Sequence, residues 1–236
     1  MTDQPGGPKP DVVLEQLLAV GKDHVSDIGE ATGILRVMQA VRVGVEKITT
    51  LMGALSWILA WVVFVLGLFN VITRYVARFI SRDIIIGEVF DLQWMVFGAL
   101  FLLALNYGVR EGVNPRIDFW WAEFSPKRKA KIDFVIHVTL FLPFCWLALR
   151  ILYPWTMTGL GRSFDGTWDT WRVWEIWEQS GDAGGLPRGP IKAIMLLGFF
   201  FLFAQIIAEM IKNVFVLIGR QDLANIAEQT APARIE

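Results

Sequence analysis

The feature that most constrains this chain is a set of four long apolar runs, each bounded by charged side chains. A helix rises about 1.5 Å per residue, so roughly 20 apolar residues cross a hydrocarbon core of about 30 Å. Lys47 and Arg74 bound the first run, and Asp91 and Arg110 bound the second. The third run continues past Arg150 if that side chain reaches the membrane surface. We predict four transmembrane helices at residues 48–73, 92–109, 134–155 and 191–218.

The composition agrees with a membrane protein. Hydrophobic residues make up 54% of the 236 residues and charged residues only 19%. A soluble domain of this length does not need so little charge, and so short a chain cannot bury four such helices. The runs also lack the alternation of membrane-spanning strands, and lipid offers no partner to an unpaired backbone. We therefore predict an all-α integral membrane protein, with three spans and a re-entrant segment as the alternative.

Charge and motif content narrow the possible functions. The net charge of -1 creates no field that attracts nucleic acid, so we expect no nucleic-acid partner. The apolar runs instead predict that membrane lipid surrounds the chain. Cys145 is the one cysteine and cannot form an intramolecular disulfide. The sequence contains no GxSxG, P-loop, HExxH or CxxC motif. We expect no catalytic residue, no cofactor and no metal, so the chain is not expected to be an enzyme.

Few polar side chains fall inside the predicted spans. His137 is the one histidine at membrane depth, and a bis-histidine haem would need a second, whereas His24 lies far outside. Glu209 and Lys212 are one helical turn apart, so we predict that they pair near the membrane surface. The other strong polar candidates are Asn70, Asn106 and Gln205. We therefore favour a non-catalytic membrane subunit. Two weaker alternatives remain. One is a membrane anchor or electron-transfer subunit of a redox complex, and the other is a stand-alone carrier.

The chain before the first span divides into two parts. Residues 1–33 form a polar extension without a basic stretch followed by an apolar one, so we expect no secretory signal. In residues 34–47, apolar side chains recur at steps of three and four, which predicts an amphipathic interfacial helix or an extension of the first span. A coiled-coil helix is the rival interpretation, but the stripe is short for sustained heptads. The stripe consists of Ile34, Met38, Val41, Val45 and Ile48.

Basic residues predict the orientation of the spans. The densest group follows the second span and comprises Arg110, Arg116, Lys127, Arg128, Lys129 and Lys131. The expected first loop contains Arg74, Arg78 and Arg82, which weighs against placing that loop outside the cytoplasm. We predict that both termini are cytoplasmic, that residues 48–219 form the membrane domain and that residues 220–236 form a cytoplasmic tail. The expected location is the bacterial inner membrane.

The third loop is rich in tryptophan and is followed by glycine and proline. Trp side chains favour the membrane interface and are also enriched in protein–protein interfaces. Two interpretations follow, a helix lying flat on the outer leaflet and a docking surface for a partner protein, while an aromatic cage for a cationic ligand is weaker. Pro190 suits the first turn of the fourth span. The tryptophans recur every third residue, at Trp168, Trp171, Trp174 and Trp177.

Small residues on the first span offer a surface for helix association. Gly53, Ala60 and Gly67 are seven residues apart, which keeps them on one helical face with about 20° of drift per step. Close approach of backbones is a main source of helix association in lipid. We predict either a contact with a partner membrane subunit or a chance seam, and the sequence leaves both open.

Three stretches resemble one transporter family. Residues 91–120 contain Asp91 and Trp94 at the start of the second span and end on Arg116 and Asp118. Residues 124–134 form a Ser-Pro basic linker, and residues 183–199 contain Pro187, Arg188 and Pro190. Together they resemble the small permease (DctQ-type) subunit of tripartite ATP-independent periplasmic (TRAP) transporters. The chain departs from the family at Asp91, where Glu is more frequent, and at Asn114, where His is common.

The resemblance implies a function without a transport site in this chain. Members sit beside a large permease subunit, which moves an organic anion, often a carboxylate, inward with sodium. A periplasmic binding protein captures that anion. The small subunit is implied to be a scaffold and a possible docking surface for the binding protein. We expect Asp91, Arg110 and Arg116 to be structural residues that anchor the short second span at the two interfaces.

Overall fold

The structure is a computed structural model, and it describes residues 33–80, 86–113, 124–181 and 185–224. Within these ranges the regular structure is helical, apart from one isolated β-bridge between Gln179 and Pro187. The elements are α2 (Ile34–Ile80), α3 (Gly87–Glu111), α5 (Pro126–Ile136), the π turn η2 (His137–Phe141), α6 (Leu142–Gly159), the 3₁₀ turn η3 (Val173–Glu175), α7 (Gly189–Leu217) and α8 (Gln221–Ala224).

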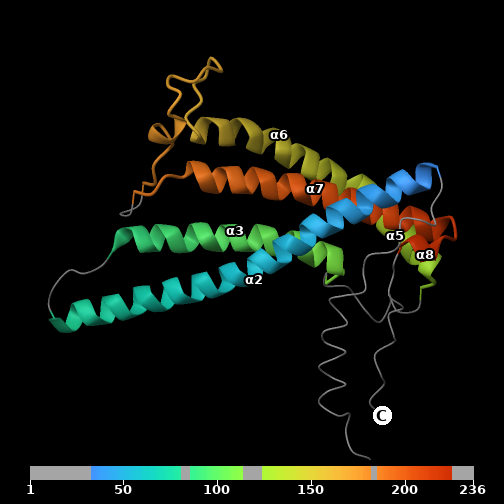
Figure 1. The fold of residues 1–236 in the computed structure, drawn as a ribbon, viewed down its shortest axis with the longest axis horizontal. Helices are drawn as coiled ribbons and strands as arrows, with labels where there is room; N and C mark the ends of the chain where they lie inside the picture. Colours follow the sequence, from blue (N-terminus) through green and yellow to red (C-terminus); the bar gives the residue numbers. More distant parts are fainter. Residues whose placement is uncertain (1–32, 81–85, 114–123, 182–184, 225–236) are drawn as a thin grey trace, which may run out of the picture.

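Four helices are long and apolar enough to cross a membrane, which confirms the predicted fold class. They are Ile34–Ile80, Gly87–Glu111, the continuous stretch Pro126–Gly159 and Gly189–Leu217. Figure 1 shows two hairpins, α2 with α3 and α6 with α7, which lie close together at one end and spread apart toward the other. Helix α7 contacts α2, α3, α5, α6 and α8, so it is the central element.

Helix α2 is longer than the predicted first span. Its 47 residues correspond to about 70 Å of helix. Residues 34–47 are therefore an extension of the first span rather than a separate interfacial helix, since no proline interrupts the chain between them. Arg74 and Arg78 lie on the last turns of α2 instead of in a loop, and Arg82 lies outside the described residues.

The apolar stripe predicted on this extension is divided between two faces. Met38 packs with Leu35 against the core formed by α5, α7 and α8. Ile34, Val41 and Ile48 are exposed instead. The face turned toward the rest of the protein is mixed, and its buried side chains are Gln39, Arg42, Val43, Glu46, Thr49 and Met52.

The third span begins earlier than its apolar run. The hydroxyl of Ser125 accepts a hydrogen bond from the backbone N–H of Arg128 at 3.4 Å, and Pro126 occupies the first turn. Both are start signals of a helix. The basic residues from Lys127 to Lys131 therefore lie on α5, not in a loop as we expected.

A π turn interrupts the third span just before Pro143. In η2 the backbone N–H of Leu142 bonds to the carbonyl of His137, one residue beyond the α-helical partner. Pro143 has no N–H to donate, so the backbone ladder is altered at this point of the span. His137 lies against the ring of Phe141, 5.5 Å between centroids. Cys145 is buried beside Leu202 and Ile206.

The C-terminal helix is part of the protein core. Gly219 has φ of +85°, a left-handed conformation that ends α7 and turns the chain back. The N–H of Arg220 bonds to the carbonyl of Phe215 at 2.9 Å. Leu223 and Ala224 are then buried with Phe215 and Ala130. The predicted tail from residue 220 therefore starts with a packed segment, and α8 lies at the same end of the bundle as the start of α2 (Figure 1).

Candidate functional sites at the two ends of the helix bundle

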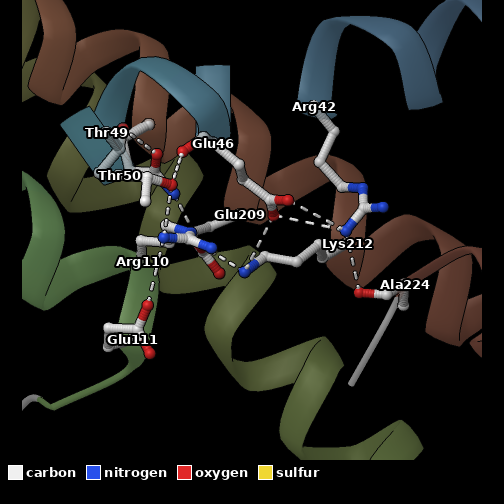
Figure 2. Close-up of polar contacts among 10 residues, drawn as sticks. Arg42, Glu46, Thr49, Thr50, Arg110, Glu111, Glu209, Lys212 and Ala224 are labelled. Atoms are coloured by element: carbon white, nitrogen blue, oxygen red, sulfur yellow. Dashed lines mark hydrogen bonds and ion pairs between the residues drawn. The ribbon is translucent and has the colours of Figure 1, made fainter. Parts of the chain in front are cut away.

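A buried ion pair joins α2 to the C-terminal helix. Arg42 is only 1% exposed, and its Nη1 lies 3.3 Å from Oε2 of Glu46, one turn later on α2. The same nitrogen donates to the backbone carbonyl of Ala224 at 3.3 Å (Figure 2). Ala224 is the last described residue of α8. Arg42 therefore holds the end of α8 against α2.

A second cation connects α2 to α7. The ammonium of Lys212 lies 2.6 Å from Oε1 of Glu209 and 3.6 Å from Oε1 of Glu46 (Figure 2). The pairing of Glu209 with Lys212 confirms the prediction from their spacing. The sequence did not predict that this pair contacts Glu46 and, through it, Arg42. Polar residues on one face of a helix look the same in the sequence whether that face is buried or exposed to water.

Neutral side chains extend this network toward the middle of the membrane. Gln205 donates to Oε1 of Glu209 at 2.9 Å, and its own carbonyl oxygen accepts from the hydroxyl of Thr49 at 2.8 Å. Both side chains are fully buried. The network, defined as Arg42, Glu46, Thr49, Gln205, Glu209, Lys212 and the Ala224 carbonyl, is called the basic-end network below.

The end of α3 is tied to the same region. Arg110 donates to the hydroxyl of Thr50 at 2.8 Å, and that hydroxyl donates to the backbone carbonyl of Glu46 at 2.7 Å (Figure 2). Arg110 also pairs with Glu111 at 3.4 Å. The predicted structural residue Arg110 therefore contacts α2, while Arg116 and Asp118 lie outside the described residues.

The basic-end network is electrically balanced. Arg42 and Lys212 carry two positive charges, and Glu46 and Glu209 carry two negative ones. Taking charges out of water is costly, and only close partners offset that cost. Because each carboxylate already contacts a cation, this arrangement is suited to joining helices rather than to attracting a further ion.

At the opposite end, the start of α3 holds the end of the third loop. The carboxylate of Asp91 is buried and accepts hydrogen bonds from the indole of Trp94 at 3.3 Å and from the backbone N–H of Leu186 at 3.2 Å. The guanidinium of Arg188 lies 5.9 Å from the centre of the Trp94 ring and donates to the hydroxyl of Ser180 at 3.4 Å. The structure thus brings together the predicted residues Asp91, Trp94 and Arg188.

A buried lysine makes a second attachment of this loop. Lys192 is 6% exposed and forms an ion pair with Glu178 of the loop. Its ammonium lies 4.3 Å from the centre of the Trp155 ring, a cation–π contact. The hydroxyl of Thr156 donates to the Lys192 backbone carbonyl at 3.2 Å. The sequence did not predict that Lys192 pairs with Glu178. A glycine- and proline-rich segment separates the two residues, so no helical spacing links them.

The tryptophan-rich segment is not an α-helix. Its one regular turn is η3 (Val173–Glu175), and the chain before it is held by local bonds. Asp165 accepts from both the backbone N–H and the hydroxyl of Thr167, at 3.0 and 2.7 Å. Bonds of this kind compete with helix formation, and they lower the pKa of Asp165 below its ordinary value. The interpretation as a flat interfacial helix is therefore wrong.

The four tryptophans have different environments. Trp168 and Trp174 are exposed, and Trp171 is 76% exposed with its ring edge-on to Trp174 at 5.6 Å. Trp177 is partly buried and packs over Gly189, where an added Cβ would lie 3.0 Å from its ring. Trp177 thus belongs to the attachment of the loop, as does the bridge at Pro187, and Pro190 lies in the first turn of α7 as predicted.

Two of the small residues on the first span face α3 of the same chain. A Cβ on Gly53 would lie 2.5 Å from the ring of Tyr107, and one on Gly67 would lie 3.3 Å from the amide of Gln93. Helix α3 of the same chain therefore lies against these two glycines, and a contact of the seam with a partner subunit stays a prediction. Ala60 is exposed.

The remaining polar residues of the spans also bond to helices. Asn106 is buried and donates to the carbonyls of Leu102 at 2.8 Å and Gly198 at 3.2 Å, which joins α3 to α7. Asn70 donates to Gln93 at 3.5 Å and joins α2 to α3. Across the described parts of the chain, no group of three or more His, Cys, Asp or Glu side chains is arranged to hold a metal ion.

Comparison with known proteins agrees with this architecture. The sequence profile of the family described as tripartite ATP-independent periplasmic transporters, DctQ component, matches residues 63–215, which is more than half of the chain. No curated protein and no solved structure matches the chain. The matched residues cover the last part of the first span, the second and third spans, the third loop and nearly all of the fourth span. This family is a transporter component and not an enzyme family. Because its profile matches more than half of the chain, the chain belongs to the DctQ component family and is a small membrane subunit of a TRAP transporter.

Proposed function

We propose that this chain is a static scaffold in a sodium-driven TRAP transporter for organic anions of the carboxylate class. The observation that supports a scaffold is the use of polar groups at membrane depth. Thr49, Gln205 and Asn106 each bond across two helices. Side chains that bind a transported ion must exchange partners during transport, whereas these hold neighbouring helices together.

The proposed partners are the large membrane subunit and a periplasmic binding protein. The most apolar window of α2 has no buried residue, so the first span offers an uninterrupted outer surface at membrane depth. Substrate choice is proposed to belong to the two partners, because Thr49, Gln205, Asn70 and Asn106 within the spans bond to this chain's own helices.

The proposed orientation places the basic-end network in the cytoplasmic half, with both termini cytoplasmic in the bacterial inner membrane. Lys127, Arg128 and Lys131 are exposed on α5 at this end, in line with the preference of basic residues for the cytoplasm. Single cysteines at Ser125 and Thr167, in a Cys145→Ser background, test it. An impermeant thiol reagent should label Thr167→Cys in intact spheroplasts and leave Ser125→Cys unlabelled, and the reverse pattern would invert the topology.

The exposed tryptophans of the third loop are the proposed docking surface for the binding protein. Trp171 and Trp174 project from a loop that is attached to helix starts through Asp91 and Lys192. A partner that docks on them does not have to order the whole loop first, which lowers the entropic cost of binding. Large, rigid aromatic side chains are the residues most often dominant in such interfaces.

Replacing Trp171 and Trp174 together by alanine tests this docking surface. Uptake by the complete transporter in proteoliposomes should fall at limiting binding-protein concentration and recover as that concentration rises. Loss of one to two hot-spot residues corresponds to roughly 2 kcal/mol or more, so the half-saturating concentration should rise by at least about thirtyfold. Trp146→Ala is the matched control, because Trp146 is also exposed but lies on α6 at membrane depth.

Two results would contradict the docking proposal. Uptake that is unchanged at every binding-protein concentration would leave these tryptophans as membrane anchors only. An equal loss in the Trp146→Ala control would show that any exposed tryptophan supports assembly.

A further inference from the structure

The outer face of α2 carries an apolar repeat that continues beyond the membrane. At its N-terminal end the repeat consists of Ile34, Val37, Val41, Ile48 and Leu51, which are 75, 62, 46, 43 and 61% exposed. With Gly44 included, neighbouring positions of the repeat are alternately three and four residues apart. The same spacing continues along α2 to Phe79, and the side chains at all of these positions are exposed. This spacing is the heptad pattern by which one helix packs along another. The exposed side chains at these positions are called the outer seam below.

The opposite face of the same segment is mixed. Its buried side chains are Val43 and the polar Gln39, Arg42, Glu46 and Thr49, whereas the outer seam carries no polar side chain. A helix that leaves the membrane with nothing on its outer side is expected to expose polar residues there. The inverted pattern indicates that another surface covers the outer seam.

Lipid reaches only part of this seam. Arg110, which ends the uncharged stretch of α3, donates to Thr50, so Thr50 lies near the edge of the hydrocarbon core. Residues 34–47 lie beyond that level and correspond to about 20 Å of helix. Here Leu35 and Met38 contact the core that contains α5 and α8, elements outside the uncharged spans.

The charges beside the outer seam indicate what kind of helix covers it. Arg36 and Lys47 are exposed on its flank, and the one acidic residue between 34 and 51, Glu46, is buried with Arg42. A second copy of this chain, inserted in the same direction, would bring the same cations to the same level and no exposed carboxylate. A partner with acidic residues at this level is complementary.

We propose that the outer seam of α2 docks a long helix of the large membrane subunit. This inference rests on the proposed function and names the surface used. The partner helix carries its own apolar heptads, continues past the cytoplasmic surface of the membrane and places carboxylates level with Arg36 and Lys47. Within the membrane the contact depends on packing, and beyond it the contact also removes Ile34, Val37 and Val41 from water.

Thiol labelling tests the seam one position at a time. In a Cys145→Ser background, single cysteines replace Ile34, Val37 and Val41 on the seam, and Lys127 and Lys131 of α5 as exposed controls at the same end of the bundle. Each variant is reconstituted into nanodiscs alone and as a purified complex with the large membrane subunit. Labelling by a water-soluble maleimide should be similar at all five positions in the chain alone. In the complex the three seam positions should slow by at least about tenfold, since a packed interface core excludes water, while the controls change little.

Each other result overturns the inference in a distinguishable way. Unchanged labelling in an intact complex would reject the seam and leave the proposed function standing. Slow labelling of the seam in the chain alone would mean that lipid or another part of this chain covers it. Protection that grows with the concentration of the chain alone would identify a second copy. If the unmodified chain forms no complex with the large subunit, the proposed function fails and the seam proposal fails with it.

Discussion

The two ends of this bundle use charge in opposite ways. At the basic end, Arg42, Glu46, Glu209 and Lys212 all lie on helices, and their network joins α2, α7 and α8. At the other end, two contacts have one member outside the helices. Asp91 of α3 binds the Leu186 amide, and Lys192 of α7 binds Glu178, so these contacts attach a loop to helix starts.

The basic-end network is a joint between helices, whereas the contacts of the third loop make that loop a fixed platform for its exposed tryptophans. The basic-end network is enclosed by helices, so removing one member leaves a buried charge with fewer partners. The loop contacts fix a segment whose outward tryptophans stay exposed, so a change there can release the loop without opening the bundle. We therefore expect stability defects from substitutions at the basic end and docking defects from substitutions at the loop end.

The largest effect is expected from Arg42→Met. The substitution removes the guanidinium that contacts both Glu46 and the carbonyl of Ala224 while keeping much of the side-chain volume. Breaking a buried ion pair from one side costs about 3–5 kcal/mol, and Lys212, which remains near Glu46, should keep the loss toward the lower figure. The free energy of unfolding in mild detergent, followed by tryptophan fluorescence, measures it.

Arg36→Met is the matched control, because Arg36 is exposed on the same helix. It should change stability by less than about 0.5 kcal/mol, as surface substitutions usually do. Arg42→Met combined with Glu46→Gln should recover part of the loss. Equal stability of the Arg42 and Arg36 variants would show that the basic-end network does not hold the helices, and the contrast between the two ends would disappear.

A smaller effect on stability is expected from Gly159→Ala at the loop end. The new Cβ overlaps the Lys192 side chain, which must move away from Trp155 and Glu178. Because the displaced atoms belong to a flexible side chain, the cost should stay near 1 kcal/mol, the low end for overpacking. Limited proteolysis of the third loop should be faster, while the unfolding of the helices changes little.

Gly181→Ala is the control within the same loop, since nothing lies within 4 Å of its added Cβ. Its loop should be cut at the rate of the unmodified chain. If Gly159→Ala destabilised the whole bundle as much as Arg42→Met, the loop contacts would be part of the same joint and not a separate platform.

Hydropathy and local spacing determined the membrane architecture. The four spans followed from apolar length, because crossing lipid requires a long helix with its own backbone bonds paired. Pro190 in the first turn of α7 and the pairing of Glu209 with Lys212 also followed from the sequence, since both depend on residues within one turn of a single helix. These features are local, so the order of residues is sufficient to predict them.

Tertiary structure alone decided which helix faces meet. The apolar stripe on residues 34–48 and the glycine seam at Gly53 and Gly67 were visible in the sequence, but their partners were not. The rotation of α2 buries Arg42 and exposes Ile34, and the register of α2 on α3 places Gly53 against Tyr107. Periodicity predicts that a helix has two faces, but the neighbour of each face depends on how several helices fill the same space.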